Sequence, residues 1–417
     1  MRKAKLVRGL RTARVKRGKP LRRRLARRIR RKKQLKRRVR LHPNVTRQAR
    51  KQPSIKQHTL AQQQLAYEAG AADGARDRAL VVQKPMSDED KRRVVEAYQR
   101  GLNAWFHQYM VPRPSFADAA QVCLAYRQGY ADAAGIKAEL QRSVPLPLRG
   151  SASVVITVCN EEETIGQLLH ELGRLPVREK VVVLNGCTDR SLERAAESPD
   201  TIMVSYRERL GHDVGRAIGA TLTSGDIVLF LDGDMLVPAE ELAAFLYAVD
   251  GGADAALNDI TPFLPSFPQQ DQVTRCKLFL NQALGRPDLQ ANSLTAVPHA
   301  LSRKAIATVG SSALGVPPKA QAIAILEGLQ VCAPCSVDVI GRNRIRPSNT
   351  GMGNQVAKLI VGDHVEALQE AMRRHGRRLL WQTNSRAVLA AERNLSLRSE
   401  QSVHHKKRKT DPGGGEP

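Results

Sequence analysis

The first 67 residues of this 417-residue chain contain no aspartate or glutamate, and no aromatic residue occurs before Tyr67. The same segment holds 26 of the 67 lysines and arginines, so the remainder carries 41 basic residues against 40 acidic ones. Nearly all of the formal charge of +27 therefore belongs to the N-terminal segment. This charge predicts salt-dependent contact with an anionic partner. Because no aromatic ring is available to stack on bases, specific nucleic-acid binding is not expected.

Long apolar runs and a cysteine framework are also missing. No run approaches the roughly 18 apolar residues of a membrane span, and the basic N-terminus lacks the apolar centre of a secretory signal. The six cysteines are scattered, which predicts a reducing cytoplasm. Cys332 and Cys335 form a lone CxxC pair, for which apolar packing is favoured over redox or metal chemistry.

Composition divides the chain into four parts. We expect a polybasic tail over residues 1–58, a helical accessory module over 59–148, an α/β domain over 149–370, and a C-terminal helix with a disordered tail over 371–417. Nucleic acid, an anionic membrane face and an acidic polymer remain open as partners of the tail. The hypothesis for location is cytoplasmic, with peripheral contact at the inner face of the membrane.

A short repeat marks the helical module. The pattern Ala-Tyr-x-x-Gly occurs at Ala66–Gly70, Ala97–Gly101 and Ala125–Gly129. We interpret each copy as part of a helix whose tyrosine packs inward and whose glycine permits close approach of a neighbouring helix. No catalytic set is visible in this module.

From Ser151 onward, apolar runs alternate with helical segments. The order is strand 153–158, helix 160–172 capped by Asn160, strand 179–184, helix 191–197, strand 201–205, a Gly-rich stretch over 210–220 and strand 226–234. Strands and helices joined by short connections are typical of a parallel, doubly wound sheet. The predicted fold class is therefore α/β.

The chain is organised around Asp232-Gly233-Asp234, which follows the apolar run 227–231. A run of this kind predicts a buried parallel strand, and ligands of such sheets bind beyond the carboxyl ends of the strands. Two adjacent carboxylates favour a hard divalent cation, and Mg²⁺ or Mn²⁺ commonly joins one or two carboxylates to a phosphate-bearing substrate. A solvated Asp-Gly-Asp turn is the alternative for an isolated motif.

Four loops follow four predicted strands: 159–162, 185–189, 210–217 and 232–234. In this order and spacing they resemble glycosyltransferase family 2 and its GT-A-fold relatives. The resemblance covers about residues 151–262 and continues more loosely to about 370. It implies a doubly wound mixed sheet of the GT-A type and transfer of a hexose-like sugar from a UDP- or GDP-sugar donor.

The resemblance also implies donor-binding residues. Val158 and Glu161 correspond to positions that contact the base and ribose. Asn185 and Asp189 bound a loop in which Asn185 replaces the usual acid and Cys187 a common serine, so the identity of the base stays open.

The remaining implied positions concern phosphate and metal. Gly211 and Arg216 match the Gly-x-x-x-Gly-Lys/Arg-Ala region, where Arg216 would meet a phosphate or steer the donor. Asp232 and Asp234 would hold the cation, with Asp234 part of the catalytic centre. His364, after a strand-like run over 356–361, is the candidate third metal ligand, and His299 is its competitor.

The acceptor half departs from the family pattern. The Glu-Asp pair that usually supplies the general base is replaced by Val316–Gln321, which contains no acid. Glu327 is the nearest candidate base, with Asp338 as the other carboxylate nearby, and a solvated role for Glu327 is an equal alternative. A displaced base and a retaining reaction both remain open. Residues 343–347 could be a loop that carries arginine towards the diphosphate, or a simple basic turn.

Two rival functions belong to other classes. One is a polyanion-binding scaffold protein with a catalytically inert GT-A domain, favoured by the missing acid and opposed by the intact Asp232 and Asp234. The other is a nucleotidyltransferase, which is disfavoured because no early Gly-rich loop containing lysine is present.

Overall fold

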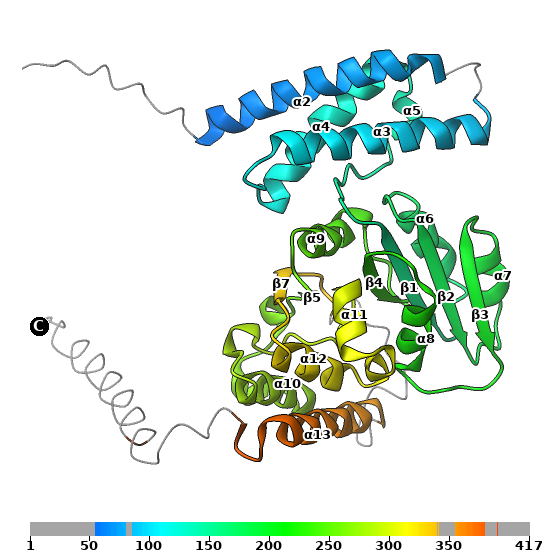
Figure 1. Ribbon diagram of the computed structural model, residues 1–417. Helices are drawn as coiled ribbons and strands as arrows, with labels where there is room; N and C mark the ends of the chain where they lie inside the picture. The colour runs from blue at the N-terminus through cyan, green and yellow to red at the C-terminus, as the bar shows by residue number, and fades with distance from the viewer. Residues whose placement is uncertain (1–54, 81–85, 340, 342–354, 380–389, 391–417) are drawn as a thin grey trace, which may run out of the picture. The chain divides into compact units, whose positions relative to one another are not determined.

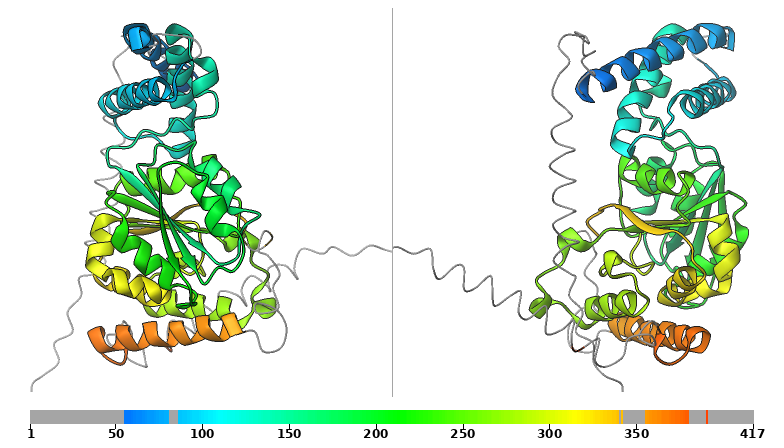
Figure 2. Two further views of the ribbon diagram at one scale, coloured as in Figure 1. Left: turned by 90° about the vertical axis from the view of Figure 1, so that its right-hand side faces the viewer. Right: turned by 60° about the vertical axis from the view of Figure 1, so that its left-hand side comes forward.

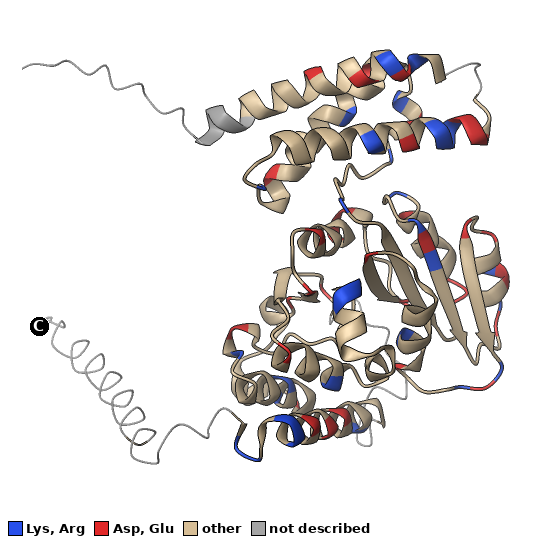
Figure 3. Cartoon of the chain, in the orientation of Figure 1, with Lys and Arg blue, Asp and Glu red and all other residues tan. Residues whose placement is uncertain are grey.

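The computed structural model describes residues 55–80, 86–339, 341, 355–379 and 390 (Figure 1). Most of the predicted polybasic tail and the loop 343–347 lie outside this range. The helical module begins at Ile55, four residues before its predicted boundary. Basic and acidic side chains are interspersed over the described helices and strands (Figure 3), in keeping with the near balance of charge after residue 67.

Four α-helices and a short 3-10 helix build the module: α2 (Ile55–Asp77), η1 (Arg78–Leu80), α3 (Asp88–Tyr109), α4 (Phe116–Ala134) and α5 (Lys137–Leu140). Helix α2 packs directly on α4. A Cβ at Gly70 would lie 2.0 Å from the Tyr126 carbonyl oxygen, and one at Gly129 would lie 2.0 Å from that of Tyr67. Only glycine allows backbones to approach this closely.

The repeat prediction holds in part. Tyr98 and Tyr126 are buried, as expected. The prediction that Tyr67 packs inward is wrong, since Tyr67 is 36% exposed and its hydroxyl donates to Asp132 Oδ2 at 3.1 Å. Gly101 faces the Tyr126 hydroxyl instead of a helix backbone.

A seven-stranded mixed sheet forms the α/β domain. The strands are β1 (Ala152–Val158), β2 (Glu179–Asn185), β3 (Thr201–Tyr206), β4 (Ile227–Asp232), β5 (Ala255–Asn258), β6 (His299–Ser302) and β7 (Val331–Cys335). Their order is β3-β2-β1-β4-β6-β5-β7, and β6 alone runs antiparallel to its neighbours β4 and β5. Three of the four predicted strands are confirmed within one residue at each end, and the fourth, predicted over 226–234, ends two residues earlier at Asp232.

Helices cover both faces of the sheet (Figures 1 and 2). One face packs on α6 (Ile165–Leu172), α7 (Ser191–Ala196) and α9 (Ala239–Asp250), and the other on α8 (Val214–Leu222), α11 (Arg303–Val309) and α12 (Pro317–Leu326). The last long helices are α10 (Gln272–Ala283) and α13 (Gln355–His375), which pack on each other; short 3-10 turns are η2 (Thr261–Phe263), η3 (Phe267–Gln269), η4 (Pro287–Leu289) and η5 (Ser311–Gly315).

Successive residues of a central strand face opposite layers. In β4, Leu229 and Leu231 join the α6–α9 layer, whereas Val228 and Phe230 join the α8–α12 layer. Both faces are therefore buried, which explains the unbroken apolar run in the sequence.

Two predicted elements are wrong. Helix α6 begins at Ile165 rather than Asn160, because Asn160 adopts a positive φ of 62° and its side chain bonds to a neighbouring loop. The run 356–361 is not a strand, because its described residues form the first turns of α13. None of the described helices combines the length and apolarity that a membrane span requires.

Contacts around Asp250 join the module to the α/β domain. The Asp250 carboxylate accepts from the backbone amides of Arg149 at 2.6 Å and Gly150 at 3.0 Å, and pairs with Arg113 Nη1 at 2.7 Å. Arg113 also lies over the Tyr247 ring, 3.9 Å from its centroid. This buried carboxylate fixes the chain as it enters β1.

Candidate active site at the carboxyl edge of the sheet

The Asp-Gly-Asp motif lies where β4 ends. Gly233 donates its amide to Thr157 O at 2.7 Å, and its carbonyl accepts from Thr164 Oγ1 at 2.5 Å. A Cβ at Gly233 would lie 2.9 Å from a methyl group of Val158. Glycine is thus required by close packing against β1, which holds Asp232 and Asp234 at a fixed place on the sheet edge.

Asp232 is an ionised, partly exposed carboxylate. Its side chain is 28% exposed, and Oδ1 accepts from Thr157 Oγ1 at 2.6 Å. Arg216 Nη2 lies 3.4 Å from both carboxylate oxygens. Burial alone would raise the pKa of Asp232, but the Arg216 guanidinium and the Thr157 hydroxyl outweigh it and lower the pKa. Asp232 is therefore negatively charged at neutral pH.

Arg216 occupies a buried position between two carboxylates. Helix α8 brings it there by packing tightly on β1: a Cβ at Gly219 would lie 2.2 Å from a Val155 methyl group. The Arg216 guanidinium pairs with Asp213 at 2.8 Å and donates to Leu294 O at 3.2 Å. Since it is only 3% exposed, Arg216 fixes the surroundings of Asp232 in this structure rather than presenting a free cation.

Hydrogen bonds tie the first two motif loops together. Asn160 Oδ1 accepts from the Thr188 amide at 2.8 Å, and Asp189 Oδ2 accepts from the Glu162 amide at 3.1 Å. The other Asp189 oxygen accepts from Ser191 Oγ at 2.6 Å. Burial would raise the pKa of Asp189, but these donors lower it. Asp189 therefore holds the two loops in register.

Asn185 ties the second motif loop to the third by hydrogen bonds. Its Nδ2 donates to Gly211 O at 2.6 Å, and its Oδ1 accepts from the Leu210 amide at 2.8 Å. Gly211 has a φ of 134°, which favours glycine. Both ends of the Asn185 amide are engaged with the loop, so the predicted direct contact with a base would require this pair of bonds to break.

Val158 and Glu161 lie beneath these loops. Val158 is 1% exposed and Glu161 is 3% exposed. The Val158 carbonyl accepts a long contact from Cys187 Sγ at 3.5 Å, and the Glu161 amide donates to Ser191 Oγ at 2.8 Å. The structure therefore brings both residues to the predicted sheet edge, in buried positions that support the loop walls.

His299 and Lys277 lie near Arg216 although neither belongs to the four motif loops. His299 is 2% exposed, stacks on Phe230 at 5.1 Å and lies near Arg216 and Asp232. Burial and the nearby Arg216 lower the pKa of His299 to about 3. Burial likewise lowers the pKa of Lys277 on α10 to about 8, with Arg216 close by. No sequence motif marks Lys277, because α10 reaches the site only through tertiary packing.

His364 does not join the two carboxylates. It lies within α13, where Nδ1 donates to Ile360 O at 2.6 Å, and burial lowers its pKa to about 4. Its buried Nε2 makes no hydrogen bond among the described residues. The adjacent Asp363 faces Asp213, and its burial raises its pKa to about 6. Within the described ranges, no three His, Cys, Asp or Glu residues form a group that could hold a metal.

Glu327, the predicted catalytic base, is engaged in an ion pair. It ends α12 and pairs with Arg374 near the end of α13. Arg374 lies eleven residues after Asp363, the part of α13 near Asp213, which is about 16 Å along a helix axis. A general base needs hydrogen-bond reach to its substrate. The role of Glu327 as a general base therefore stays a prediction, and its ion pair with Arg374 is the contact that such a role would have to break.

Buried amides replace the missing acid. Gln321 is 1% exposed, accepts from the Leu294 amide at 2.8 Å and donates to Asn281 Oδ1 at 2.7 Å. Asn281 in turn donates to Asn292 O at 3.0 Å. This network fixes the chain around Leu294, whose carbonyl contacts Arg216. Gln321 thus acts as a structural residue where a general base was expected.

The residues of the Asp-Gly-Asp edge fit a hard divalent cation. Asp232 is ionised yet keeps part of its carboxylate exposed, and Asp234 is half-buried two residues later. Mg²⁺ and Mn²⁺ use oxygen ligands and are commonly held by one or two carboxylates together with substrate phosphates. A two-carboxylate site that leaves the other positions to a diphosphate suits this chemistry.

Comparison with known proteins identifies the family that the central part of the chain matches. Residues 153–306 match the family described as glycosyl transferase family 2. This segment is a family 2 glycosyltransferase domain. The matched range begins in β1 and ends in α11, so it contains all four motif loops and His299.

One relative of the family 2 domain is the undecaprenyl-phosphate 4-deoxy-4-formamido-L-arabinose transferase of Edwardsiella ictaluri (strain 93-146). It is 32% identical over 114 residues, which cover 24% of this chain and 34% of that protein. The chain therefore spans about a third of the length of this relative.

Solved structures of glucosyl-3-phosphoglycerate synthase from Mycobacterium tuberculosis are also similar. The complex with Mn²⁺, uridine diphosphate and phosphoglyceric acid has a TM-score of 0.41 at 20% identity, over 52% of this chain and 78% of that one. The complex with Mn²⁺, UDP-glucose and phosphoglyceric acid has a TM-score of 0.40 at 19% identity, over 52% and 80%.

Proposed function

We propose that the domain over residues 149–370 transfers a sugar from a nucleotide-diphosphate donor, UDP- or GDP-linked. One observation carries this proposal: hydrogen bonds and an ion pair tie the family motif loops together around Asp232. Asn160 joins the first loop to the second, Asn185 joins the second to the third, and Arg216 joins the third to the fourth. A shared ligand at the sheet edge explains why these loops converge.

The residues of this edge divide the work of donor binding. Asp232 and Asp234 would hold Mg²⁺ or Mn²⁺, which supplies neutralisation of the charge on the diphosphate. Arg216 lies between Asp213 and Asp232 and pairs with both carboxylates, which offsets the repulsion between them. The Asn185–Gly211 and Asp189–Glu162 bonds hold the walls that a nucleoside would contact. Lys277 adds a cation near Arg216 that suits a phosphate.

An anionic acceptor is the second part of the proposal. The segment 1–67 holds 26 basic residues and no acidic ones, which favours a phosphate-bearing lipid or polymer at the cytoplasmic face of a membrane. The E. ictaluri relative carries the name of such a lipid, undecaprenyl phosphate. Deletion of residues 1–54 should abolish low-salt binding to anionic vesicles, and retained binding would refute this role of the segment.

The donor is tested by thermal stabilisation of the full chain. A panel of UDP- and GDP-sugars is added with and without Mn²⁺, since a ligand that binds the folded state raises the melting temperature. The expected result is a Mn²⁺-dependent rise with one nucleotide, lost in Asp234→Asn. The control is Asp200→Asn, which changes an exposed carboxylate just before β3, away from the motif loops. If no donor raises the melting temperature of the wild type, the result favours the alternative of a scaffold protein with an inert domain.

A further inference from the structure

A basic groove lies at the opposite edge of the sheet from Asp232. It has a volume of about 530 Å³ and is formed by the amino end of β2, the ends of α6 and α7, and the segment that precedes β1. Four lysine and arginine side chains line it: Arg142, Arg174, Lys180 and Arg194. None of the family motif loops contributes to it.

Lys180 is a buried cation at the floor of this groove. It is 9% exposed, and its position on β2 places it on the same sheet face as Val182, beneath α6 and α7. The ammonium donates to Ser198 Oγ at 3.2 Å, and among the described residues it has no ion-pair partner. Burial lowers the pKa of Lys180, and the charge of the nearby Asp200 opposes this more weakly. A buried ammonium with one neutral partner retains two donors for a ligand.

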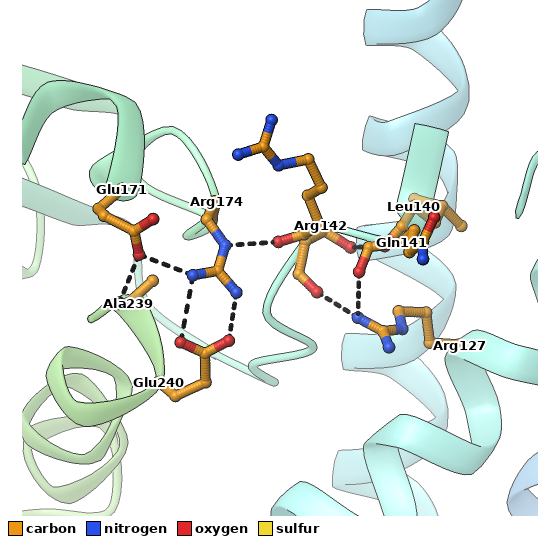
Figure 4. A network of polar contacts seen from close by, with 9 residues as sticks. Arg127, Leu140, Gln141, Arg142, Glu171, Arg174, Ala239 and Glu240 are labelled. Atoms are coloured by element: carbon orange, nitrogen blue, oxygen red, sulfur yellow. Dashed lines mark hydrogen bonds and ion pairs between the residues drawn. The ribbon is translucent and has the colours of Figure 1, made fainter. Parts of the chain in front are cut away.

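Arg142 supplies a second uncommitted cation at a fixed place. Its carbonyl accepts from Arg174 Nε at 2.8 Å, and the Val144 amide donates to Arg174 O at 2.8 Å, so the backbone at 142–144 is bonded to the end of α6. Figure 4 shows the Arg174 guanidinium engaged with Glu171 and Glu240, whereas the Arg142 guanidinium extends away from these pairs. Arg142 is thus held by its backbone while its charge remains available.

The groove also offers acceptors. Glu139 and Glu197 line it, and Glu197 is 63% exposed despite its contact with Arg194. Carboxylates of this kind accept hydrogen bonds from hydroxyl groups, while lysine and arginine donate to phosphate oxygens. A ligand that combines a phosphate with hydroxyl groups matches both halves of the lining.

We propose that this groove is a second binding site, for a phosphorylated polyol, with Lys180 and Arg142 as the phosphate donors. Glycerol 3-phosphate is the simplest probe of this class. The same chemistry occurs in a free metabolite and in the headgroup of phosphatidylglycerol, so both sources are tested. The site is independent of the proposed transfer reaction, because none of its lining residues belongs to the Asp232 edge.

The test is isothermal titration of glycerol 3-phosphate into the full chain at fixed ionic strength, with glycerol as the uncharged reference. The N-terminal basic segment is the same in every variant and would contribute equally to anion binding in each, so only differences between variants count. Lys180→Met and Arg142→Gln should each weaken binding about tenfold, the effect of losing a charged hydrogen bond. Arg178→Gln is the matched control: this exposed arginine precedes β2 but does not line the groove.

Two readouts separate the outcomes. Lys180→Met should melt at a higher temperature than wild type without ligand, since it removes a buried charge, and at the same temperature or lower once glycerol 3-phosphate is saturating. If Lys180→Met fails to fold, Arg142→Gln alone decides, because Arg142 is exposed. Equal affinity in all variants, or an equal loss in Arg178→Gln, overturns the proposal. Weakened binding of phosphatidylglycerol vesicles by the two groove variants identifies the headgroup as a source, and unchanged vesicle binding identifies the free metabolite.

Discussion

Carboxylates at the two edges of the sheet differ in how completely they are hydrogen-bonded by the protein. At the amino edge, Glu179 accepts from the Ser224 amide at 2.9 Å and Ser153 Oγ at 2.8 Å, and Asp226 accepts from the Ser151 amide and hydroxyl at 2.8 and 2.9 Å. At the carboxyl edge, Asp232 receives one short bond from Thr157 and two contacts of 3.4 Å from Arg216. The carboxylates of the first edge are fully hydrogen-bonded, whereas Asp232 at the second edge is only partly bonded.

This difference separates stability from function. A carboxylate whose oxygens are filled by protein donors contributes to folding and has little left for a ligand. A carboxylate that is ionised but incompletely bonded lowers the stability of the free protein. Binding of a ligand to this carboxylate then raises the stability of the folded state. Substitutions at the two edges should therefore have opposite signatures.

The largest effect is expected on activity, from Asp232→Ala. Donor-dependent transfer should fall about a thousandfold, the scale of losing a metal ligand or a main electrostatic contact. The free energy of unfolding should change by less than about 1 kcal/mol, since Arg216 keeps Asp213 at 2.8 Å. Transfer assays and urea unfolding measure the two quantities. A loss of several kcal/mol would show that this carboxylate is a stability residue after all.

Asp250→Ala should show the opposite result, a loss of stability with little change in donor binding. Its carboxylate is 2% exposed and serves Arg113 and the amides of Arg149 and Gly150. Removing it leaves a partly buried guanidinium without its carboxylate partner, which costs about 3 kcal/mol. Donor binding should stay within about twofold of wild type. Asp250→Asn is the milder control, because the amide oxygen still accepts from the two backbone amides; equal losses in both variants would contradict a charge effect.

Asn185→Ala tests the loop ties of the carboxyl edge. It removes both bonds to the 210–211 loop, so donor affinity should fall about tenfold, which equals about 1.4 kcal/mol. Asn103→Ala is the matched control, since Asn103 Oδ1 accepts from the Leu148 amide at 3.1 Å in the module. It should reduce stability without changing donor affinity. A similar affinity loss in both variants would assign the effect to general loosening.

The smallest effect is expected from Glu179→Gln, about 1 kcal/mol of stability at pH 7. Burial would raise the pKa of Glu179, but the Ser224 and Ser153 donors lower it below that of an unfolded glutamate, about 4.3. The wild-type advantage is therefore full above pH 4.3 and disappears as the pH falls through the lowered folded pKa. Urea unfolding between pH 3 and 7 checks this, and a pH-independent difference would argue against the ionised form as its source.

Local pattern was enough to predict the parts of the fold that depend on it. Continuous apolar runs predicted β1, β2 and β4, because a strand buried on both faces has no other composition available. The run 356–361 misled, because a short apolar run does not distinguish a strand from a buried helix face. Asn160 misled for another reason: its side chain bonds to Thr188, a residue that only the folded sheet brings near.

The same distinction applies to the site. Asp232, Asp234 and the loops around them were predictable, since they follow strands that end at one edge. The environments of Lys277, His299 and Asp363 were not, because they depend on how α10, β6 and α13 pack around Arg216 and Asp213. Gln321 shows the limit most clearly: its sequence position marks a missing acid, and only its bonds to Leu294 and Asn281 reveal what replaces it.

Strand β4 has a consequence for how this chain tolerates insertions. Val228, Phe230 and Asp232 share the α8 face by alternation, so the face of Asp232 depends on the parity of the residues before it. One residue added or lost within 227–231 would turn Asp232 towards α6 and away from Arg216. Two residues would restore its face but displace it along β1. Length changes within β4 should therefore abolish the contact between Asp232 and Arg216.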